Sequence, residues 1–140
     1  MTRTMDESET LELIAAGKVG HLGCVVQGEP YVVPINYLFE GDSILGHSML
    51  GRKIRALRID PRACLQVEEV EGDFHWRSAI AFGDFEEIHQ EPERAQVMRK
   101  LLERYPLLTP VESVAAKNME KSEVIVFRIR VNRMTGLAED

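Results

Sequence analysis

Short turns separate the β-type segments in the first half of this 140-residue chain, and their spacing restricts the folds open to it. Two apolar stretches rich in β-branched residues, 19–27 and 31–38, are joined by a turn that contains a Gly and a Pro. A second tight turn, residues 40–43, leads into another apolar run, 44–47. Connections this short join antiparallel neighbours, because parallel neighbours need a crossover of roughly a dozen residues or more. We therefore expect an antiparallel sheet.

Three more strands are predicted later in the chain. Residues 63–70 form an apolar run, and residues 74–88 alternate between apolar and polar side chains, with Gly83 expected to bend this long strand. Residues 123–131 begin as a continuous apolar run and then alternate, as expected of a strand buried at one end. Pro34 has no backbone N–H, so its strand is predicted to lie at an edge or to direct its polar groups toward something other than a strand.

Helical patterns interrupt these strands. Asp6 and Glu9 form a capping box for a first helix, and Gly17 is expected to end it in a left-handed conformation. Further helices are expected over residues 52–60, 92–105 and 110–117. Six strands with closely spaced turns and peripheral helices predict a mainly β fold, a six-stranded antiparallel barrel in one domain spanning residues 1–140. The buried face of the first helix is predicted to carry Leu11, Ile14 and Ala15.

Acidic residues outnumber basic ones by 23 to 17, which gives a net charge of -6. This balance argues against a nucleic acid or a membrane as partner, because both call for a broad basic surface. No apolar run is long enough for a membrane span or an export signal, and we expect a cytoplasmic protein. Cys24 and Cys64 lie in apolar runs and are expected to be two buried, reduced thiols, with a disulfide or redox pair as the alternative.

A local reversal of charge occurs at the predicted helix that follows residue 51. Cations at a helix N-terminus add to the positive end of the helix dipole, whereas a bound phosphate would turn this cost into an attraction. Arg52 and Lys53, with the hydroxyl of Ser48 and a strand–turn–helix backbone, therefore predict a site for a phosphate monoester. For Arg55 and Arg58, the other two cations of this helix, a solvent-exposed helix face is the simpler interpretation. The four side chains are Arg52, Lys53, Arg55 and Arg58, and no acid stands among them.

Other cofactor and catalytic motifs are absent from the sequence. No GxxxxGK[ST] or GxGxxG loop follows a strand, which disfavours ATP-driven and dinucleotide-fold chemistry. The four histidines lack metal-ligand spacing, so no metal site is expected, and all but His47 are interpreted as surface or packing residues. No GxSxG elbow indicates a hydrolase. Trp76 is predicted to pack in the core or at an interface, with a position beside an aromatic ligand as the alternative.

Five short motifs keep a definite order along nearly the whole chain. Together they resemble the pyridoxamine 5'-phosphate oxidase-like flavin-binding split-barrel family, nearest to its nitroimidazole-resistance branch, whose members are homodimers that hold FMN between subunits. The motifs are Gly28-x-Pro30-Tyr31-Val32-Val33-Pro34, His47-Ser48-x-x-Gly51-Arg52-Lys53, Asp60-Pro61-Arg62-Ala63-Cys64, Trp76-x-Ser78 and Gly83.

The resemblance implies an FMN site at the interface of a homodimer. Arg52 and Lys53 would hold the FMN phosphate, with help from Ser48 and the adjoining backbone. Backbone polar groups of one strand would meet the heteroatoms of the flavin ring. The residues of that strand are Val33, Pro34, Ile35 and Asn36.

The resemblance also implies roles for residues further along the chain. Trp76 and Ser78 would approach the flavin from the long strand, near the partner subunit. His47 would lie beside the flavin and contact the ring or the substrate, which makes it the candidate catalytic residue. Residues 132–137 lack the Arg-x-His pair with which pyridoxamine phosphate oxidases contact their substrate, so vitamin B6 oxidation is not expected.

The implied function is an FMN-dependent oxidoreductase that carries electrons from a reduced nicotinamide to a small organic acceptor, either nitro-aromatic or quinone-like. The alternative is a non-catalytic module that binds, stores or senses a flavin, a deazaflavin or haem, because relatives of this fold bind each of these groups.

Overall fold

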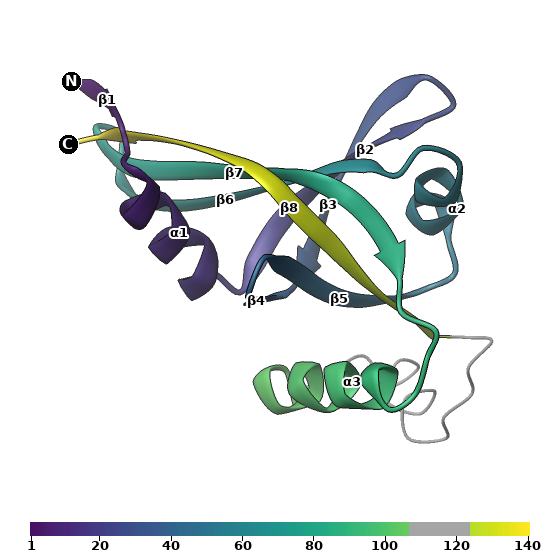
Figure 1. Ribbon diagram of the computed structural model, residues 1–140. Helices are drawn as coiled ribbons and strands as arrows, with labels where there is room; N and C mark the ends of the chain where they lie inside the picture. The colour runs from purple at the N-terminus through teal and green to yellow at the C-terminus, as the bar shows by residue number, and fades with distance from the viewer. Residues whose placement is uncertain (107–123) are drawn as a thin grey trace.

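The computed structural model describes residues 1–106 and 124–140 of the chain. Within these residues the strands form one extended sheet, and three helices lie around it (Figure 1). The two chain ends lie side by side, and the last strand crosses the whole molecule. The elements are β1 (Thr2–Thr4), α1 (Glu7–Ala16), β2 (Val19–Val26), β3 (Glu29–Asn36), β4 (Leu38–Glu40), β5 (Ser43–Met49), α2 (Arg52–Ile59), β6 (Arg62–Gly72), β7 (His75–Glu87), α3 (Glu93–Arg104) and β8 (Val124–Glu139).

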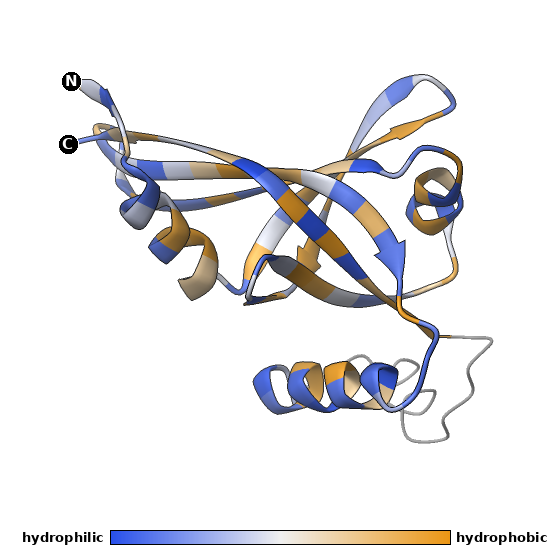
Figure 2. Cartoon of the chain, in the orientation of Figure 1, coloured by the Kyte–Doolittle hydropathy of each residue, from blue (hydrophilic) through white to orange (hydrophobic). Residues whose placement is uncertain are grey.

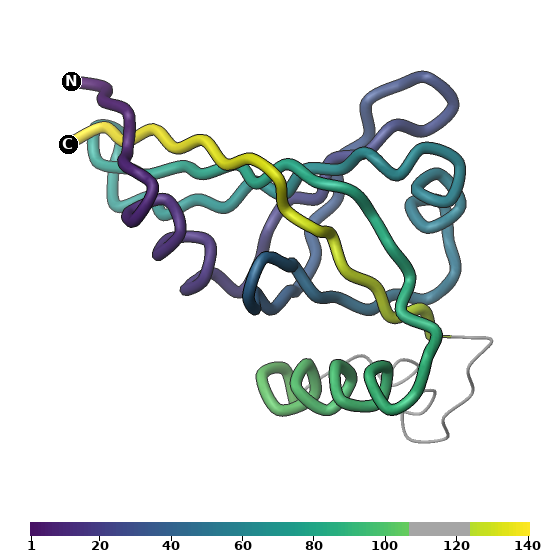
Figure 3. Tube along the Cα trace, viewed as in Figure 1, coloured from purple at the N-terminus to yellow at the C-terminus, as the bar shows by residue number. Residues whose placement is uncertain are grey.

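The strands pair antiparallel in the order β3-β2-β6-β7-β8-β5-β4, and β1 pairs with the end of β8. Figure 3 shows how the chain reverses at each hairpin to build this order. The path ends at β3 and β4, so the sheet is open. The mainly β, antiparallel prediction is confirmed, and so is the edge position of the strand that contains Pro34.

The described residues contain eight strands where the sequence predicted six. The two additions, β1 and β4, have three residues each, which is too short for a periodic hydropathy pattern. β8 also continues to Glu139 instead of ending at residue 131, and its alternating hydropathy can be followed in Figure 2. The helix predicted over residues 110–117 lies outside the described residues.

Two hydrophobic cores occupy opposite faces of β5 and β8. Ile44 and Phe127 belong to the main core inside the curled sheet, whereas the adjacent Leu45 and Val126 belong to a second core. Neighbouring side chains of a strand point to opposite faces, so the second core lies on the far side of these strands. It is covered by α3, which contributes Val97, Met98 and Leu101.

α1 begins at the predicted capping box, where the Asp6 side chain accepts a hydrogen bond of 2.8 Å from the Glu9 amide. Ile14 is buried as predicted, but the other two residues of the predicted buried face are not, because Leu11 is 38% exposed and Ala15 is also exposed. Thr10, one turn after the cap, is buried instead. Its hydroxyl donates a hydrogen bond of 2.8 Å to the Asp6 carbonyl, so this buried polar group is satisfied without water. The residues that α1 buries are Thr10, Leu13 and Ile14.

The predicted left-handed conformation of Gly17 is also wrong, since this residue is extended with φ -68°. Glycine is required here for space: a Cβ at position 17 would lie 2.3 Å from the hydroxyl oxygen of Tyr37. The glycine therefore marks a close approach of the end of α1 to a buried aromatic ring.

Polar side chains from two other elements satisfy the carbonyl groups at the end of α1. Tyr37 is fully buried and its hydroxyl donates to the Ile14 carbonyl, while burial raises the pKa of this phenol above its ordinary value. Arg104 donates to the Gly17 carbonyl at 2.8 Å, and the hydroxyl of Tyr105 donates to the carbonyl of Tyr37. These bonds tie α1 and the end of α3 to the β3–β4 junction.

Removing the Tyr37 hydroxyl should destabilise the protein. We expect Tyr37→Phe to lower the free energy of unfolding by about 1–3 kcal/mol, because a buried carbonyl at Ile14 loses its donor. Urea denaturation followed by circular dichroism measures this change. Tyr31→Phe, on the half-buried face of β3, is the matched control and should shift the free energy by less than about 0.5 kcal/mol. Equal midpoints for the two variants would contradict the role given to the Tyr37 hydroxyl.

Candidate functional site

The N-terminus of α2 has the features of an anion site. α2 begins at Arg52, as predicted, and buries Ile54 and Leu57. Its N-cap, Gly51, has an extended backbone and no side chain that could accept from the first amides, and the first turn contains no acid. The amide groups of this turn and two cationic side chains, Arg52 and Lys53, therefore concentrate positive charge at one point.

Both cations at the start of α2 lie over the β2–β3 hairpin. The Arg52 guanidinium carbon is 5.9 Å from the centre of the Tyr31 ring, within the range of a cation–π contact. Burial raises the pKa of the Cys24 thiol, and the charge of Lys53 acts on it in the opposite direction. Lys53 is thus close to β2, while Arg52 covers β3.

The other two cations of α2, Arg55 and Arg58, lie further along the helix. Arg55 is exposed, and Arg58 forms a 2.6 Å ion pair with Glu87 of β7. Both side chains are largely in solvent, as the simpler interpretation of the sequence had it.

β3 offers its free backbone edge next to this cationic point. Pro34 and Asn36 are exposed, and Asn36 donates to the Lys18 carbonyl at 3.2 Å. Val33 and Ile35 pack their side chains against the main core, so only their backbone can meet a ligand. Because β3 ends the sheet, no strand pairs with its outer edge among the described residues.

The other two predicted site residues near α2, Ser48 and His47, point to opposite faces of β5. Ser48 is buried and its hydroxyl donates to the Met49 carbonyl at 2.9 Å. His47 is half-buried opposite Val126, on the face of β5 that carries the second core. In this arrangement the Ser48 proton is directed to the Met49 carbonyl and not to a ligand.

Trp76 lies apart from the cationic point. The pairing register places Tyr31 level with Gly83, and Trp76 is seven residues further along β7, or about 23 Å at about 3.3 Å per residue. It pairs with Glu139 near the chain ends, whereas α2 lies at the opposite end of the molecule in Figure 1. One protomer therefore does not bring Trp76 and Arg52 together.

Ser78 belongs to a row of polar side chains that the sequence did not predict. Gln66 donates to the Ser78 hydroxyl oxygen at 3.0 Å, and the Gln66 carbonyl oxygen is 3.0 Å from Nδ1 of His21. The row crosses β2, β6 and β7 on the sheet face opposite the main core, and His21 pairs directly with Pro34. His21 was interpreted as an isolated surface or packing residue; here it joins two predicted site residues, Pro34 and Ser78.

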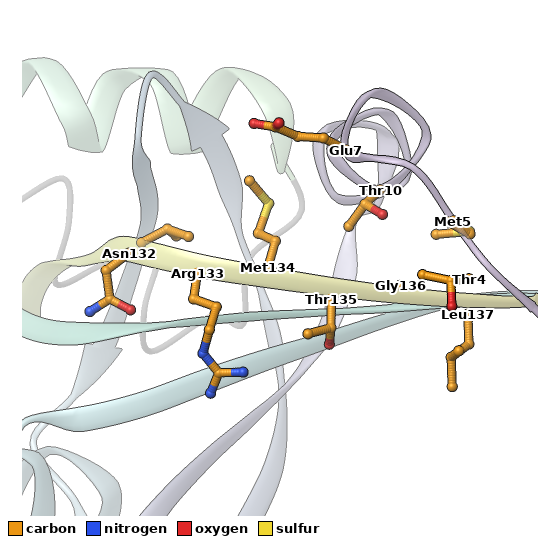
Figure 4. A pocket seen from close by; sticks show the side chains of 11 residues that line it. Thr4, Met5, Glu7, Thr10, Asn132, Arg133, Met134, Thr135, Gly136 and Leu137 are labelled. Atoms are coloured by element: carbon orange, nitrogen blue, oxygen red, sulfur yellow. The ribbon is translucent and has the colours of Figure 1, made fainter.

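A groove of about 690 Å³ lies between the N-terminal segment and β8. Figure 4 shows Met134 directed toward α1, whereas Arg133 points to the other side of β8. There the Arg133 guanidinium carbon stacks 3.9 Å from the centre of the Phe82 ring. None of the predicted site residues lines this groove. Its lining is Thr4, Met5, Glu7, Thr10, Val131, Asn132, Arg133, Met134, Thr135, Gly136 and Leu137.

Three further predictions concern thiols, metals and membranes. Cys24 and Cys64 are both free thiols, as predicted, but only Cys24 is buried, and Cys64 is half-buried on the opposite face of the sheet. Within residues 1–106 and 124–140, no group of three or more His, Cys, Asp or Glu side chains could hold a metal ion. No helix in the same part of the chain has the length and apolar character needed to cross a membrane.

Comparison with known proteins gives a family match over almost the whole chain. Residues 6–138 match the family model described as pyridoxamine 5'-phosphate oxidase. An uncharacterised protein of Rhizobium meliloti is 30% identical over 145 residues, which cover 97% of this chain and 94% of the relative.

Solved structures share the fold over 90% or more of the chain. A FAD-binding protein from Mesorhizobium loti has a TM-score of 0.79 and 26% identity, with 100% of this chain and 99% of that chain covered. A candidate 5-nitroimidazole antibiotic resistance protein from Bacteroides thetaiotaomicron has a TM-score of 0.77 and 24% identity, covering 99% and 87%. A haem-binding protein from Mycobacterium smegmatis has a TM-score of 0.73 and 21% identity, covering 90% and 51%.

Proposed function

We propose, from the premise that the chain belongs to the pyridoxamine 5'-phosphate oxidase family, that it binds FMN and works as a cytoplasmic flavin-dependent oxidoreductase. A bound flavin would supply hydride and single-electron transfer, here from a reduced nicotinamide to a nitro-aromatic or quinone-like acceptor. The observation that carries the proposal is the start of α2, with no side-chain cap, no acid and two cations in its first turn.

This arrangement suits a phosphate monoester of a mononucleotide. Amide donors of the first turn and the ammonium of Lys53 would hold the phosphate oxygens, and Arg52 would add a planar guanidinium that already covers Tyr31. From Tyr31 to Pro34 the strand advances three residues, or about 10 Å. The backbone of residues 33–36 is then available to hydrogen-bond the polar atoms of the flavin ring.

A homodimer would complete this site. On the sheet face opposite the main core, Val32 is 63% exposed, Val70 61% and Leu137 48%, which is apolar surface that a second copy would cover. Trp76 lies on the same face, too far from Arg52 to act within one protomer, so we propose that it approaches the flavin of the partner subunit. We propose His47 as the residue that contacts the substrate or ring.

An absorption spectrum of the purified protein tests the proposal first. FMN bands that are released by heat, or that appear when FMN is titrated into cofactor-free protein, are the expected result. FAD released in place of FMN, a Soret band from haem, or no spectral change on titration would each contradict FMN as the cofactor.

Anaerobic mixing then tests the oxidoreductase part. A reduced nicotinamide should bleach the bound flavin, and a nitro-aromatic or quinone acceptor should restore its colour. A flavin that binds tightly but is reduced no faster than free FMN would favour the alternative, a protein that stores or senses its ligand.

A further inference from the structure

The row His21–Gln66–Ser78 has a direction that is set by its central residue. A glutamine amide nitrogen can only donate and its oxygen can only accept. Gln66 donates through Nε2 to Ser78 Oγ, so Ser78 is the acceptor in that bond, and its own proton is left for another acceptor. At the other end, Gln66 Oε1 accepts, so Nδ1 of His21 must carry the proton.

Fixing Nδ1–H leaves the second ring nitrogen of a neutral His21 as an acceptor. Among the described residues, no hydrogen bond uses this nitrogen or the Ser78 proton. One end of the row, at His21, can therefore accept a hydrogen bond from a ligand, and the other end, at Ser78, can donate one. The imide part of a flavin ring carries both complements, an N–H donor and carbonyl acceptors.

The row also has the right place in the sheet. His21 lies between Gln66 and Pro34, the position on β3 where the ring is proposed to bind. All three side chains of the row are half-buried on the face that remains outside the main core. Phe82, four residues from Ser78 on the same face of β7, contributes an aromatic surface near them.

We infer that Gln66 is a positioning residue of the flavin site, which orients the row so that Ser78 donates to a flavin carbonyl and His21 presents a ring-nitrogen acceptor. This inference rests on the proposed function. Gln66 acts through its two neighbours and does not itself touch the ligand.

The polarity of the row can be measured without any cofactor. Long-range ¹⁵N–¹H NMR of the histidine rings, with the His21 signals identified by loss in His21→Phe, should show the Nδ1–H tautomer in the wild-type protein. Gln66→Leu should release this tautomer, because the acceptor is gone. A wild-type His21 with its proton on Nε2 would overturn the inference.

Gln66→Glu separates the two ends of the row. A carboxylate at position 66 still accepts a hydrogen bond from His21 but cannot donate one. The Ser78 hydroxyl then donates to this carboxylate and can no longer donate to the ligand. We expect FMN dissociation constants about three- to tenfold higher for both Gln66→Glu and Ser78→Ala. In the Ser78→Ala background, Gln66→Glu should add less than about a twofold change.

The outcomes separate this inference from the proposed function. Wild-type protein that does not bind FMN overturns both. Wild-type protein that binds FMN, with an unchanged dissociation constant in Gln66→Glu, overturns the inference alone. A further loss from Gln66→Glu when Ser78 is already alanine also overturns it, because the effect would then not pass through Ser78.

Discussion

Lys53→Ala is expected to weaken FMN binding by about 1.5–3 kcal/mol, the range for a hydrogen bond to a charged group. The dissociation constant should rise by about 10- to 150-fold, since each 1.4 kcal/mol corresponds to about a factor of ten. Lys53 is half-buried over β2, so its charge is less screened than that of a surface lysine. Fluorescence titration of cofactor-free protein with FMN measures the change.

The matched control is Arg58→Ala, which removes the same charge from the same helix. Arg58 lies in the last turn of α2 and pairs with Glu87, away from the proposed phosphate. Its loss should leave the FMN dissociation constant within about a factor of two, because exposed ion pairs contribute little and act locally. If Lys53→Ala and Arg58→Ala bind FMN equally well, the start of α2 is not the phosphate site.

The start of α2 and the edge position of β3 could be predicted because their signals are local. A Gly, two cations and a Pro within residues 51–61 define where the helix begins and ends, and Pro34, which has no N–H, keeps its strand out of the centre of the sheet. None of these conclusions needs a contact between distant segments. The same holds for the N-cap of α1, where the Asp6 side chain accepts from the Glu9 amide as predicted, although the Glu9 carboxylate pairs with Arg3.

Features that depend on strand register could not be predicted. Gln66 meets His21 from 45 residues away and Ser78 from 12 residues away, and a shift of one residue in either pairing would turn these side chains to the other face. In the sequence, Gln66 is one more polar residue in an alternating strand. The conformation of Gly17 was mispredicted for a related reason. A glycine is needed there because the Tyr37 side chain, which is distant in sequence, packs against it.

Gly83→Ala is expected to destabilise the protein more than any other single methyl group added to the sheet. A Cβ at position 83 would lie 2.2 Å from the carbonyl oxygen of Arg130 and 2.7 Å from its carbonyl carbon. Both are backbone atoms of β8, which cannot rotate away as the end of a side chain can. We expect the free energy of unfolding to fall by about 3 kcal/mol or more, and the melting temperature by about 10 °C.

The clash arises from the bend that the sequence predicted at this glycine. Phe82 pairs with Arg133 and Gly83 with Val131, so Asn132 is an extra residue in β8 and the two backbones approach closely at the bulge. Gly72→Ala is the matched control, because it also lies at a register shift, between β6 and β7, and nothing stands within 4 Å of its added Cβ. It should change the free energy of unfolding by less than about 1 kcal/mol. Thermal unfolding should therefore give a lower melting temperature for Gly83→Ala than for Gly72→Ala. Equal melting temperatures would mean that β8 can move away from position 83. The bulge would then not fix the β7–β8 pairing register, which determines the sheet face on which Ser78 lies.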